Sequence, residues 1–169
     1  MSNEVLTLRE LRQGDLPQVL TWRNHLQVRR HMLTQHEISA EEHAQWFSKL
    51  QQDPQRHAVL VHEQQQPLGL AHFTQVNSQG VVDWGFYLTP DAPKGSGSKL
   101  ARMALDFAFQ QQGWHKVCGQ VIASNAASRR FHLKMGFTLE GVLRQQALIC
   151  NEWLSLWCFG LVSSEWKPT

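Results

Sequence analysis

The sequence lacks the features of a membrane-spanning, secreted or nucleic-acid-binding protein. No apolar run among its 169 residues approaches the ~18 residues of a membrane span. The first five residues carry neither the basic segment nor the apolar core of a signal peptide. The net charge is only +2, and the basic residues are scattered, which argues against a nucleic-acid-binding surface. We therefore expect a cytoplasmic protein that binds neither nucleic acid nor membrane.

Disulfide and metal-binding patterns are also missing. The three cysteines, Cys118, Cys150 and Cys158, are odd in number and form no Cys-x-x-Cys pair, which predicts reduced thiols and no metal site. The sequence has no internal repeat, and 42% of its residues are hydrophobic. A chain of this length is sufficient for one hydrophobic core. We expect a single domain over residues 1–169.

The most informative stretch is a glycine- and serine-containing loop between an apolar strand, Trp84–Pro90, and a helix that continues through Phe109. N–H groups at a helix start have no intrahelical partner and carry partial positive charge. Gly95 and Gly97 would let an oxyanion approach these groups closely. The loop also offers hydroxyl and ammonium groups, on Ser96, Ser98, Lys94 and Lys99.

This loop predicts a phosphate or pyrophosphate site, although Gly-x-Gly also follows strands in ordinary turns. Two common nucleotide motifs are excluded. No Gly-Lys-Ser/Thr follows at the spacing of a nucleoside-triphosphate loop, and Leu100 stands where the dinucleotide fingerprint would continue.

Hydrophobic periodicity predicts strands and helices in mixed order. Asp15 is the expected N-cap of the first helix, and Ser39 with Glu42 forms a capping box for the second. A strand, two helices, a three-strand meander and then helix–strand–helix–strand–strand favour an α+β fold with a largely antiparallel sheet. The expected strands are 5–10, 57–63, 68–76, 81–89, 115–122, 137–144 and 153–162, and the expected helices begin near 16, 40, 96 and 125.

A second motif follows the loop at a defined separation. It is Asn-x-x-Ser-x-x-x-His-x-x-x-Gly-Phe, with Asn125, Ser128, His132, Gly136 and Phe137. Together, the two motifs resemble those of the GCN5-related N-acetyltransferase (GNAT) superfamily, and the similarity extends from Val5 to Trp166. The resemblance implies a mixed, mostly antiparallel sheet of about seven strands flanked by about four helices.

The resemblance also implies acetyl-CoA as the acetyl donor. Its pyrophosphate would lie on the N–H groups of Lys94, Gly95, Ser96, Gly97 and Ser98. Its pantetheine arm would lie between two splayed strands, near 84–89 and 116–122, and pair with them like an added strand. The arm would contact the backbone of Leu88 and Thr89 and the side chains of Asn125 and Ser128.

Two positions depart from the family pattern. Ala92 stands where the family usually has Gln or Arg, and Lys94 is the candidate replacement for that cation. His132 stands where the family usually has the Tyr that protonates the departing thiolate. His132 is therefore a candidate acid, with packing against the cofactor as the alternative.

The attacking amine must lose a proton, so a base or a water chain is required. His72 and Asp83 are the candidate bases, because both lie near strand centres in the predicted sheet. The alternatives are a hydrogen-bonded sheet histidine and a solvated strand aspartate.

The N-terminal half resembles the branch of the family that includes ribosomal-protein N-terminal and spermidine acetyltransferases. Within that branch it is most similar to enzymes that acetylate the 4-amino group of a UDP-amino sugar in pseudaminic acid biosynthesis. Cationic and aromatic side chains suit a diphosphate and a uracil, although Trp46 can equally be a core residue. The predicted acceptor-binding residues are Arg23, Met32, His43, Trp46, Thr74 and Tyr87.

Two other functions stay open at this stage. One is acetylation of a protein N-terminus or a small amine, although a cationic peptide would want an acidic cleft and this segment is basic. The other is a non-catalytic acyl-CoA-binding module, in which Ala92 and His132 would mark lost activity. The expected assembly is a monomer or a homodimer.

Overall fold

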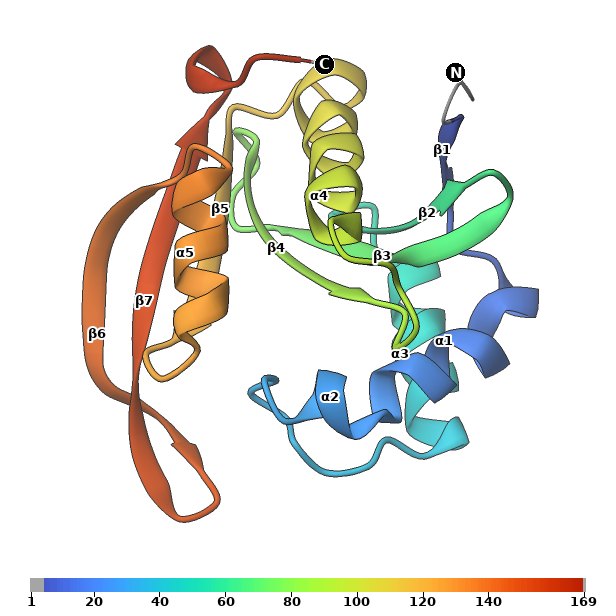
Figure 1. The fold of residues 1–169 in the computed structure, drawn as a ribbon, viewed down its shortest axis with the longest axis horizontal. Coiled ribbons are helices and arrows are strands. Elements are labelled where there is room, and N and C mark those ends of the chain that lie inside the picture. The colour runs from blue at the N-terminus through green and yellow to red at the C-terminus, as the bar shows by residue number, and fades with distance from the viewer. Residues whose placement is uncertain (1–4, 169) are drawn as a thin grey trace.

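The computed structural model describes residues 5–168 and has the predicted α+β architecture (Figure 1). Residues 1–4, part of the segment that argued against a signal peptide, lie outside the described residues. The strands are β1 (Leu6–Glu10), β2 (Arg56–Glu63), β3 (Gln66–Gln75), β4 (Val81–Leu88), β5 (Lys116–Ile122), β6 (Thr138–Ile149) and β7 (Glu152–Val162). The helices are α1 (Leu16–Asn24), α2 (Leu26–Arg29), α3 (Ala40–Gln52), α4 (Ser96–Asp106), which continues as a π-helical turn over Phe107–Gln111, and α5 (Ala126–Lys134).

The seven strands form one sheet in the order β1-β2-β3-β4-β5-β7-β6. Every neighbouring pair is antiparallel except β4 and β5. These two parallel strands pair only where Val81–Asp83 meets Lys116–Cys118. Beyond Asp83 they diverge, which confirms the splay that the family resemblance implied.

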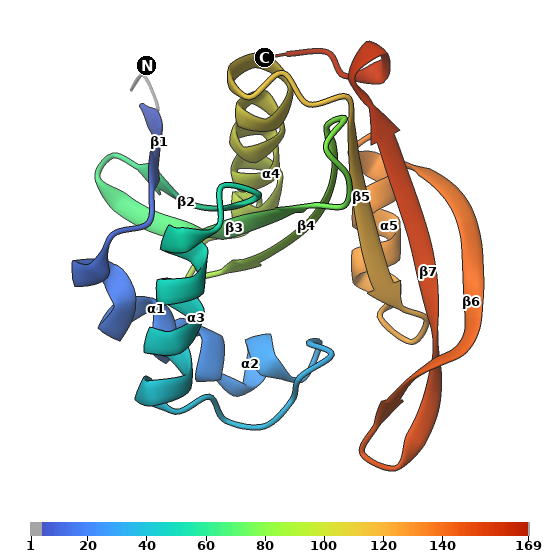
Figure 2. The same cartoon turned by 180° about the vertical axis from the view of Figure 1, so that it is seen from behind.

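The helices cover the sheet unevenly. Figures 1 and 2 show α4 on one face of the β1–β4 half, α1 to α3 on the other face, and α5 against the β5–β7–β6 half. Side chains of β4 alternate between the two faces. Trp84 packs in the core that contains α4, whereas Tyr87 packs with α1 and α3. β4 therefore contributes side chains to both cores of the domain, and beyond Asp83 its edge is not paired with β5.

The capping predictions had different outcomes. Ser39 and Glu42 form the expected reciprocal capping box at the start of α3. Asp15 occupies the N-cap position of α1 but makes no side-chain cap. Its carboxylate accepts two hydrogen bonds from Arg9, both at 2.7 Å, and one from the N–H of Arg12. The ion pair with Arg9 thus takes the carboxylate that would otherwise cap the N–H groups of α1.

The helix count also differs from the prediction, because five α-helices stand within residues 5–168 where about four were expected. The additional one is α2, a single short turn directly after α1. Its N-cap is the ring of His25, which accepts from the N–H of Gln27. No helix in residues 5–168 is long and apolar enough to cross a membrane.

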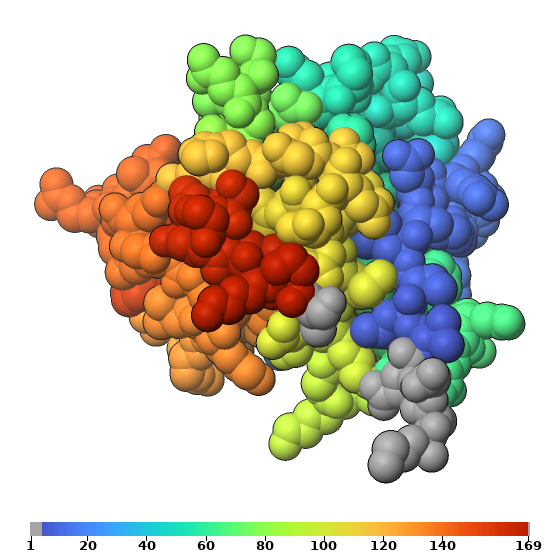
Figure 3. All heavy atoms as spheres, turned by 90° about the horizontal axis from the view of Figure 1, so that it is seen from above, coloured from blue at the N-terminus to red at the C-terminus, as the bar shows by residue number. Residues whose placement is uncertain are grey.

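The C-terminal residues pack back on the domain. Figure 3 shows them (red) lying against the α4 region (yellow). The indole N–H of Trp166 donates to Asp106 at 2.7 Å, and its ring lies 6.2 Å from that of Phe109. This contact ties the end of the chain to the helix that begins at the predicted anion site.

Gly69 should be a sensitive position for stability. A Cβ there would lie 2.7 Å from Leu100 Cδ1 of α4 and 2.9 Å from the backbone of Leu88. We predict that Gly69→Ala lowers the free energy of unfolding by about 1–3 kcal/mol, because overpacking forces backbone shifts. Gly141→Ala is the matched strand control, since a Cβ at Gly141 meets no atom within 4 Å. Urea denaturation of both variants measures the difference, and equal losses would contradict the prediction.

Candidate active site

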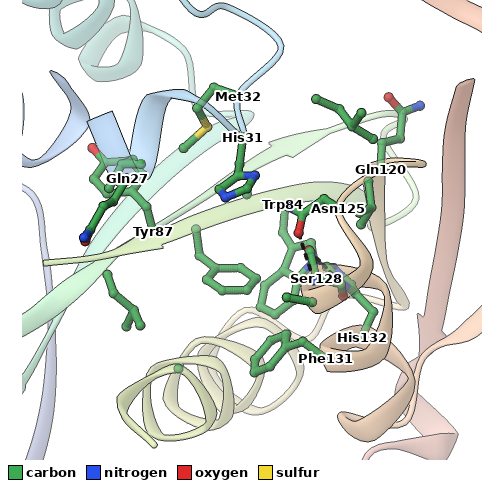
Figure 4. Close-up of a pocket in the computed structure, with 18 of the residues that line it drawn as sticks. Gln27, His31, Met32, Trp84, Tyr87, Gln120, Asn125, Ser128, Phe131 and His132 are labelled. Carbon is green, nitrogen blue, oxygen red and sulfur yellow. Dashed lines mark hydrogen bonds between the residues drawn. The ribbon is translucent and has the colours of Figure 1, made fainter. Parts of the chain in front are cut away.

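The divergence of β4 from β5 opens a cleft of about 540 Å³, here called the interstrand cleft. Its walls come from five places: the α2 segment, β4, the start of α4, β5 and α5. Figure 4 shows side chains from the α2 segment and from α5 directed into it from opposite sides. The cleft is lined by Gln27, Val28, His31–Leu33, Trp84–Pro90, Ala92, Gly97, Gln120–Ile122, Asn125, Ala127, Ser128, Phe131 and His132.

The glycine loop opens α4 at the end of β4, as the sequence predicted. Gly95 is the N-cap residue with a φ of 93°, a left-handed conformation that favours glycine. The N–H groups of Lys94, Gly95 and Gly97 have no hydrogen-bond partner within residues 5–168. Gly97 also lines the cleft. These groups fit an oxyanion of the donor.

Three other members of the loop differ from the prediction. The N–H of Ser98, expected to meet the pyrophosphate, donates to Gly95 O at 3.2 Å. Ser96 is 2% exposed and does not line the cleft, and its N–H donates to Pro93 O. Lys99 forms an ion pair with Glu63 of β2, which holds the start of α4 against the sheet. Lys94 is exposed and remains the candidate cation where Ala92 replaces the usual polar residue.

The edge of β4 carries the predicted pantetheine contacts only in part. Thr89 N–H donates to Leu68 O at 2.8 Å, and Thr89 O accepts from Ala92 N–H. Both backbone groups of Thr89 are therefore occupied. Successive N–H groups of a strand point to opposite edges, so the N–H of Leu88 faces the cleft. Leu88, rather than Thr89, is the residue available to pair with an extended ligand.

Asn125 and Ser128 lie at the start of α5 and line the cleft. Asn125 Oδ1 accepts from Ser128 N–H at 3.1 Å and caps the helix. The Asn125 amide NH₂ has no partner within residues 5–168. The arrangement explains the Asn-x-x-Ser spacing physically, because a cap reaches the third residue of its helix. The NH₂ group of Asn125 is therefore free to donate to a carbonyl oxygen of a ligand.

His132 is held in one chemical state by its neighbours. Trp84 Nε1–H lies 3.3 Å from His132 Nε2, and His132 Nδ1 lies 2.8 Å from Ser128 O. Nδ1 must donate to that carbonyl, so Nε2 accepts from the indole. A Cβ at Gly119 would lie 2.8 Å from Nε2 and 2.9 Å from the indole nitrogen, and glycine there leaves room for the pair.

Burial is the main cause that lowers the pKa of His132 below its usual value, against the opposing hydrogen bond to Ser128. A neutral ring with an occupied Nε2 has no proton to give to a thiolate. The structure therefore favours the alternative role, packing at the donor site, over the predicted role of acid.

A second cavity of about 320 Å³, here called the helix-side pocket, lies against the other face of β3 and β4. It brings together Arg23, His43, Trp46 and Tyr87, four of the six predicted acceptor-binding residues. His43 stacks on Trp46 with ring centroids 5.2 Å apart. The complete lining is Arg23, Thr34, Ile38, Glu42, His43, Trp46, Leu70, His72 and Tyr87.

The pocket contains an unusual cation. Arg23 Nη2 donates to Thr34 O at 2.9 Å, whereas Nη1 is buried without a partner within residues 5–168. Desolvation lowers the pKa of Arg23. Burial also lowers the pKa of His43, as does the charge of Arg23. A buried, unpaired guanidinium N–H is costly, so this group is positioned to receive an anionic or strongly accepting ligand.

Two predicted acceptor-binding residues, Met32 and Thr74, and one candidate base, Asp83, lie outside the helix-side pocket. Met32 lines the interstrand cleft and not the helix-side pocket. Thr74 and Asp83 face each other across β3 and β4, and both are exposed and line neither cavity. Partial desolvation of its carboxylate raises the pKa of Asp83, but the residue is absent from both linings.

His72 lies over Gly85, whose missing side chain makes room for its ring. It makes no hydrogen bond to any described residue and lines the helix-side pocket. Desolvation first, then the charge of Arg23, lowers its pKa to about 4. An imidazole with so low a pKa is a weak proton acceptor near neutral pH. The structure thus places His72 in the pocket rather than in the cleft where a base is needed.

Sequence reasoning missed three polar residues of the interstrand cleft: Gln27, His31 and Gln120. Gln27 and His31 lie in and just after α2, and no sequence motif marks them. Gln120 is on β5 and faces the cleft only because that strand diverges from β4. Their convergence depends on strand and helix placement far apart in sequence.

The splayed parallel pair, the glycine loop at the start of α4 and the capping asparagine are the features expected of an acetyl-CoA-dependent N-acetyltransferase. The sequence matches the acetyltransferase (GNAT) domain family over residues 5–138. The chain therefore belongs to the GNAT family, whose members transfer an acetyl group from acetyl-CoA.

Known relatives agree with this family. The Campylobacter jejuni protein called acetyltransferase PseH is 26% identical over 130 residues, which are 77% of this chain and 81% of the relative. Spermidine N(1)-acetyltransferase of Vibrio cholerae is 25% identical over 150 residues, 87% of each chain. The crystal structure of a Vibrio cholerae spermidine N-acetyltransferase with CoA and spermine has a TM-score of 0.87 at 23% identity, over 95% of this chain and 96% of that one.

The state of His132 can be measured directly. We predict that nitrogen-detected NMR of the labelled protein shows His132 protonated on Nδ1 alone, with a pKa below 6.5. Trp84→Phe removes the indole donor and should raise that pKa, because Nε2 is then free to take a proton. Trp157→Phe is the control, since Trp157 makes no hydrogen bond to His132. A proton on Nε2 in the unmodified protein would contradict the assignment.

Proposed function

We propose that this N-acetyltransferase acetylates the 4-amino group of a UDP-linked amino sugar. The observation that carries the proposal is the buried, unpaired Nη1 of Arg23 in the helix-side pocket. A diphosphate offers several anionic oxygens, and a guanidinium binds such groups strongly. Tyr87 lines both cavities, so a ligand anchored at Arg23 can extend past Tyr87 toward the thioester.

The aromatic and imidazole groups of the pocket suit the nucleotide end of such a ligand. Trp46 is partly buried and stacks on His43, which leaves a flat apolar surface beside N–H donors. Uracil combines a flat ring with carbonyl acceptors. The residue pattern of this segment resembles the UDP-4-amino-4,6-dideoxy-N-acetyl-β-L-altrosamine N-acetyltransferase of pseudaminic acid biosynthesis, and the similarity to acetyltransferase PseH is consistent with that resemblance.

The main competing acceptor is a polyamine, since spermidine acetyltransferases are among the relatives. A polyamine carries several positive charges and needs carboxylates to bind it. The described lining of the two cavities contains a single carboxylate, that of Glu42. It already accepts from Ser39 N–H and lies 3.0 Å from His36. The same electrostatic argument disfavours a cationic N-terminal peptide.

A panel assay decides among these acceptors. Purified protein with acetyl-CoA is offered UDP-4-amino sugars, spermidine, amino acids and N-terminal peptides, and thiol release is followed with mass spectrometry of the product. The proposal expects turnover with the UDP-4-amino sugars and an acetamide at position 4. Faster acetylation of spermidine or of a peptide would contradict the proposal and identify that amine as the acceptor.

Substitution of Arg23 tests acceptor binding directly. We predict that Arg23→Met raises the KM for the UDP-amino sugar by about 10- to 100-fold, the value of one charge-assisted hydrogen-bonded contact. The KM for acetyl-CoA should not change, because Arg23 is absent from the interstrand cleft. Arg29→Met is the matched control on the neighbouring helix, where Arg29 pairs weakly with Glu37 at 4.0 Å. Equal effects of both substitutions would show that charge in general, and not the pocket, governs binding.

A further inference from the structure

Transfer to an amine needs a proton acceptor close to the thioester. Three titratable side chains line the interstrand cleft within residues 5–168: His31, Tyr87 and His132. Burial raises the pKa of Tyr87 well above its usual value, so its phenolate is not available near neutral pH. His132 Nε2 accepts from the Trp84 indole inside the core, where the ring is only 4% exposed, whereas His31 is exposed to solvent. His31 is the titratable residue left with a proton-accepting role.

The position of His31 suits that role. It follows α2, on the wall of the cleft that lies opposite α5 and the donor-binding Asn125. Figure 4 shows its ring projecting into the cleft toward β4, beside Met32. The N–H of Leu88 and the anion-binding loop lie on the donor side. A nucleophile that enters from the helix-side pocket, past Tyr87, would therefore meet the thioester beneath His31.

The chemical state of His31 is also appropriate. Arg30 Nε–H donates to His31 Nε2 at 3.1 Å. Partial desolvation, and then the positive charge of Arg30, lower the pKa of His31. The ring is therefore neutral near pH 7, with a lone pair directed at a replaceable donor. Across the cleft it faces Tyr87 from β4 and His132 from α5, and no carboxylate lines the cleft within residues 5–168.

Neighbouring interactions hold this segment in place. Arg23 and Asn24 of α1 bond to Thr34 O and to the backbone of Ile38. Gln35 donates to Arg30 O and approaches Cys150 of the β6–β7 hairpin at 3.8 Å. His31 is thus presented by a loop that is fastened at several points, which a positioned base requires.

We propose that His31 is the general base of acetyl transfer. The amine nitrogen attacks the thioester carbonyl carbon and forms the new C–N bond. His31 Nε2 takes the proton from that nitrogen, and the amine N–H replaces the Arg30 donor. The C–S bond then breaks, its electron pair leaves on sulfur, and the CoA thiolate takes a proton from solvent. The inference rests on the family activity and is independent of the acceptor's identity.

The kinetic test uses His31→Gln and His31→Ala, with whichever amine of the acceptor panel the unmodified protein acetylates. We predict that both lower kcat by about 100-fold or more, the usual worth of a positioned base, with the KM for acetyl-CoA unchanged. In His31→Gln, the rate should rise continuously with pH up to the amine's own pKa. Added imidazole should restore part of the activity of His31→Ala, which a purely structural role would not allow.

His36→Gln is the matched control, an exposed histidine of the same loop that lines neither cavity. Its kcat should equal that of the unmodified protein. The inference is overturned if His31→Gln keeps kcat within about threefold of that value, a barrier change below 1 kcal/mol. It is equally overturned if the pH profiles of the two proteins coincide.

A second measurement needs no acceptor. The nitrogen resonances of His31 are followed by NMR through a pH titration, with and without a non-hydrolysable thioether analogue of acetyl-CoA. Because the ring of His31 lines the cleft, analogue binding should shift its resonances and its pKa, whereas the resonances of His36 should stay fixed. An unshifted His31 would overturn the proposal. A protein that binds the analogue and shifts His31, but acetylates no UDP-amino sugar, would refute the proposed acceptor alone.

Discussion

The site depends on the loss of pairing between β4 and β5. The two strands are hydrogen-bonded only over three residues each, and their free edges then stay open to a ligand. In a sheet, an unpaired edge normally risks pairing with a strand of another chain. Here it is enclosed by α5 on one side and by the α2 segment on the other, so it admits an extended molecule and excludes another strand. Gly97 of the glycine loop, Asn125, His31 and Tyr87 all line this opening.

Desolvation determines the chemistry on both sides of the opening. It lowers the pKa values of His43, His72 and His132, because a charged imidazole is disfavoured where water is excluded. Within residues 5–168, the cavities are therefore lined by neutral imidazole rings, by the guanidinium of Arg23 and by one carboxylate, that of the exposed Glu42. Such a site is suited to ligands that bring negative charge or hydrogen-bond acceptors, and it is unsuited to ligands with several ammonium groups.

Much of the fold followed from local patterns. The capping box at Ser39 and the glycine at the start of α4 each act over a few residues, and each was found as predicted. Two predictions, for Asp15 and for Thr89, were wrong because of tertiary contacts. Asp15 was expected to cap α1, but Arg9 lies across from it and binds its carboxylate. The same holds for Thr89, whose backbone groups are occupied by Leu68 and Ala92. In both cases a tertiary partner replaced the local or ligand partner that the pattern suggested.

By itself, the sequence indicated the family and the acetyl donor, because both follow from motif spacing. It also singled out four residues that line the helix-side pocket, from their residue type. Tertiary structure decided what individual groups can do. His132 and Trp84 are 48 positions apart, and only their contact over Gly119 shows that Nε2 is occupied. His31 carries no motif, yet the fold directs it into the cleft. Protonation depends on burial and on partners, and both are set by packing between distant segments rather than by local sequence.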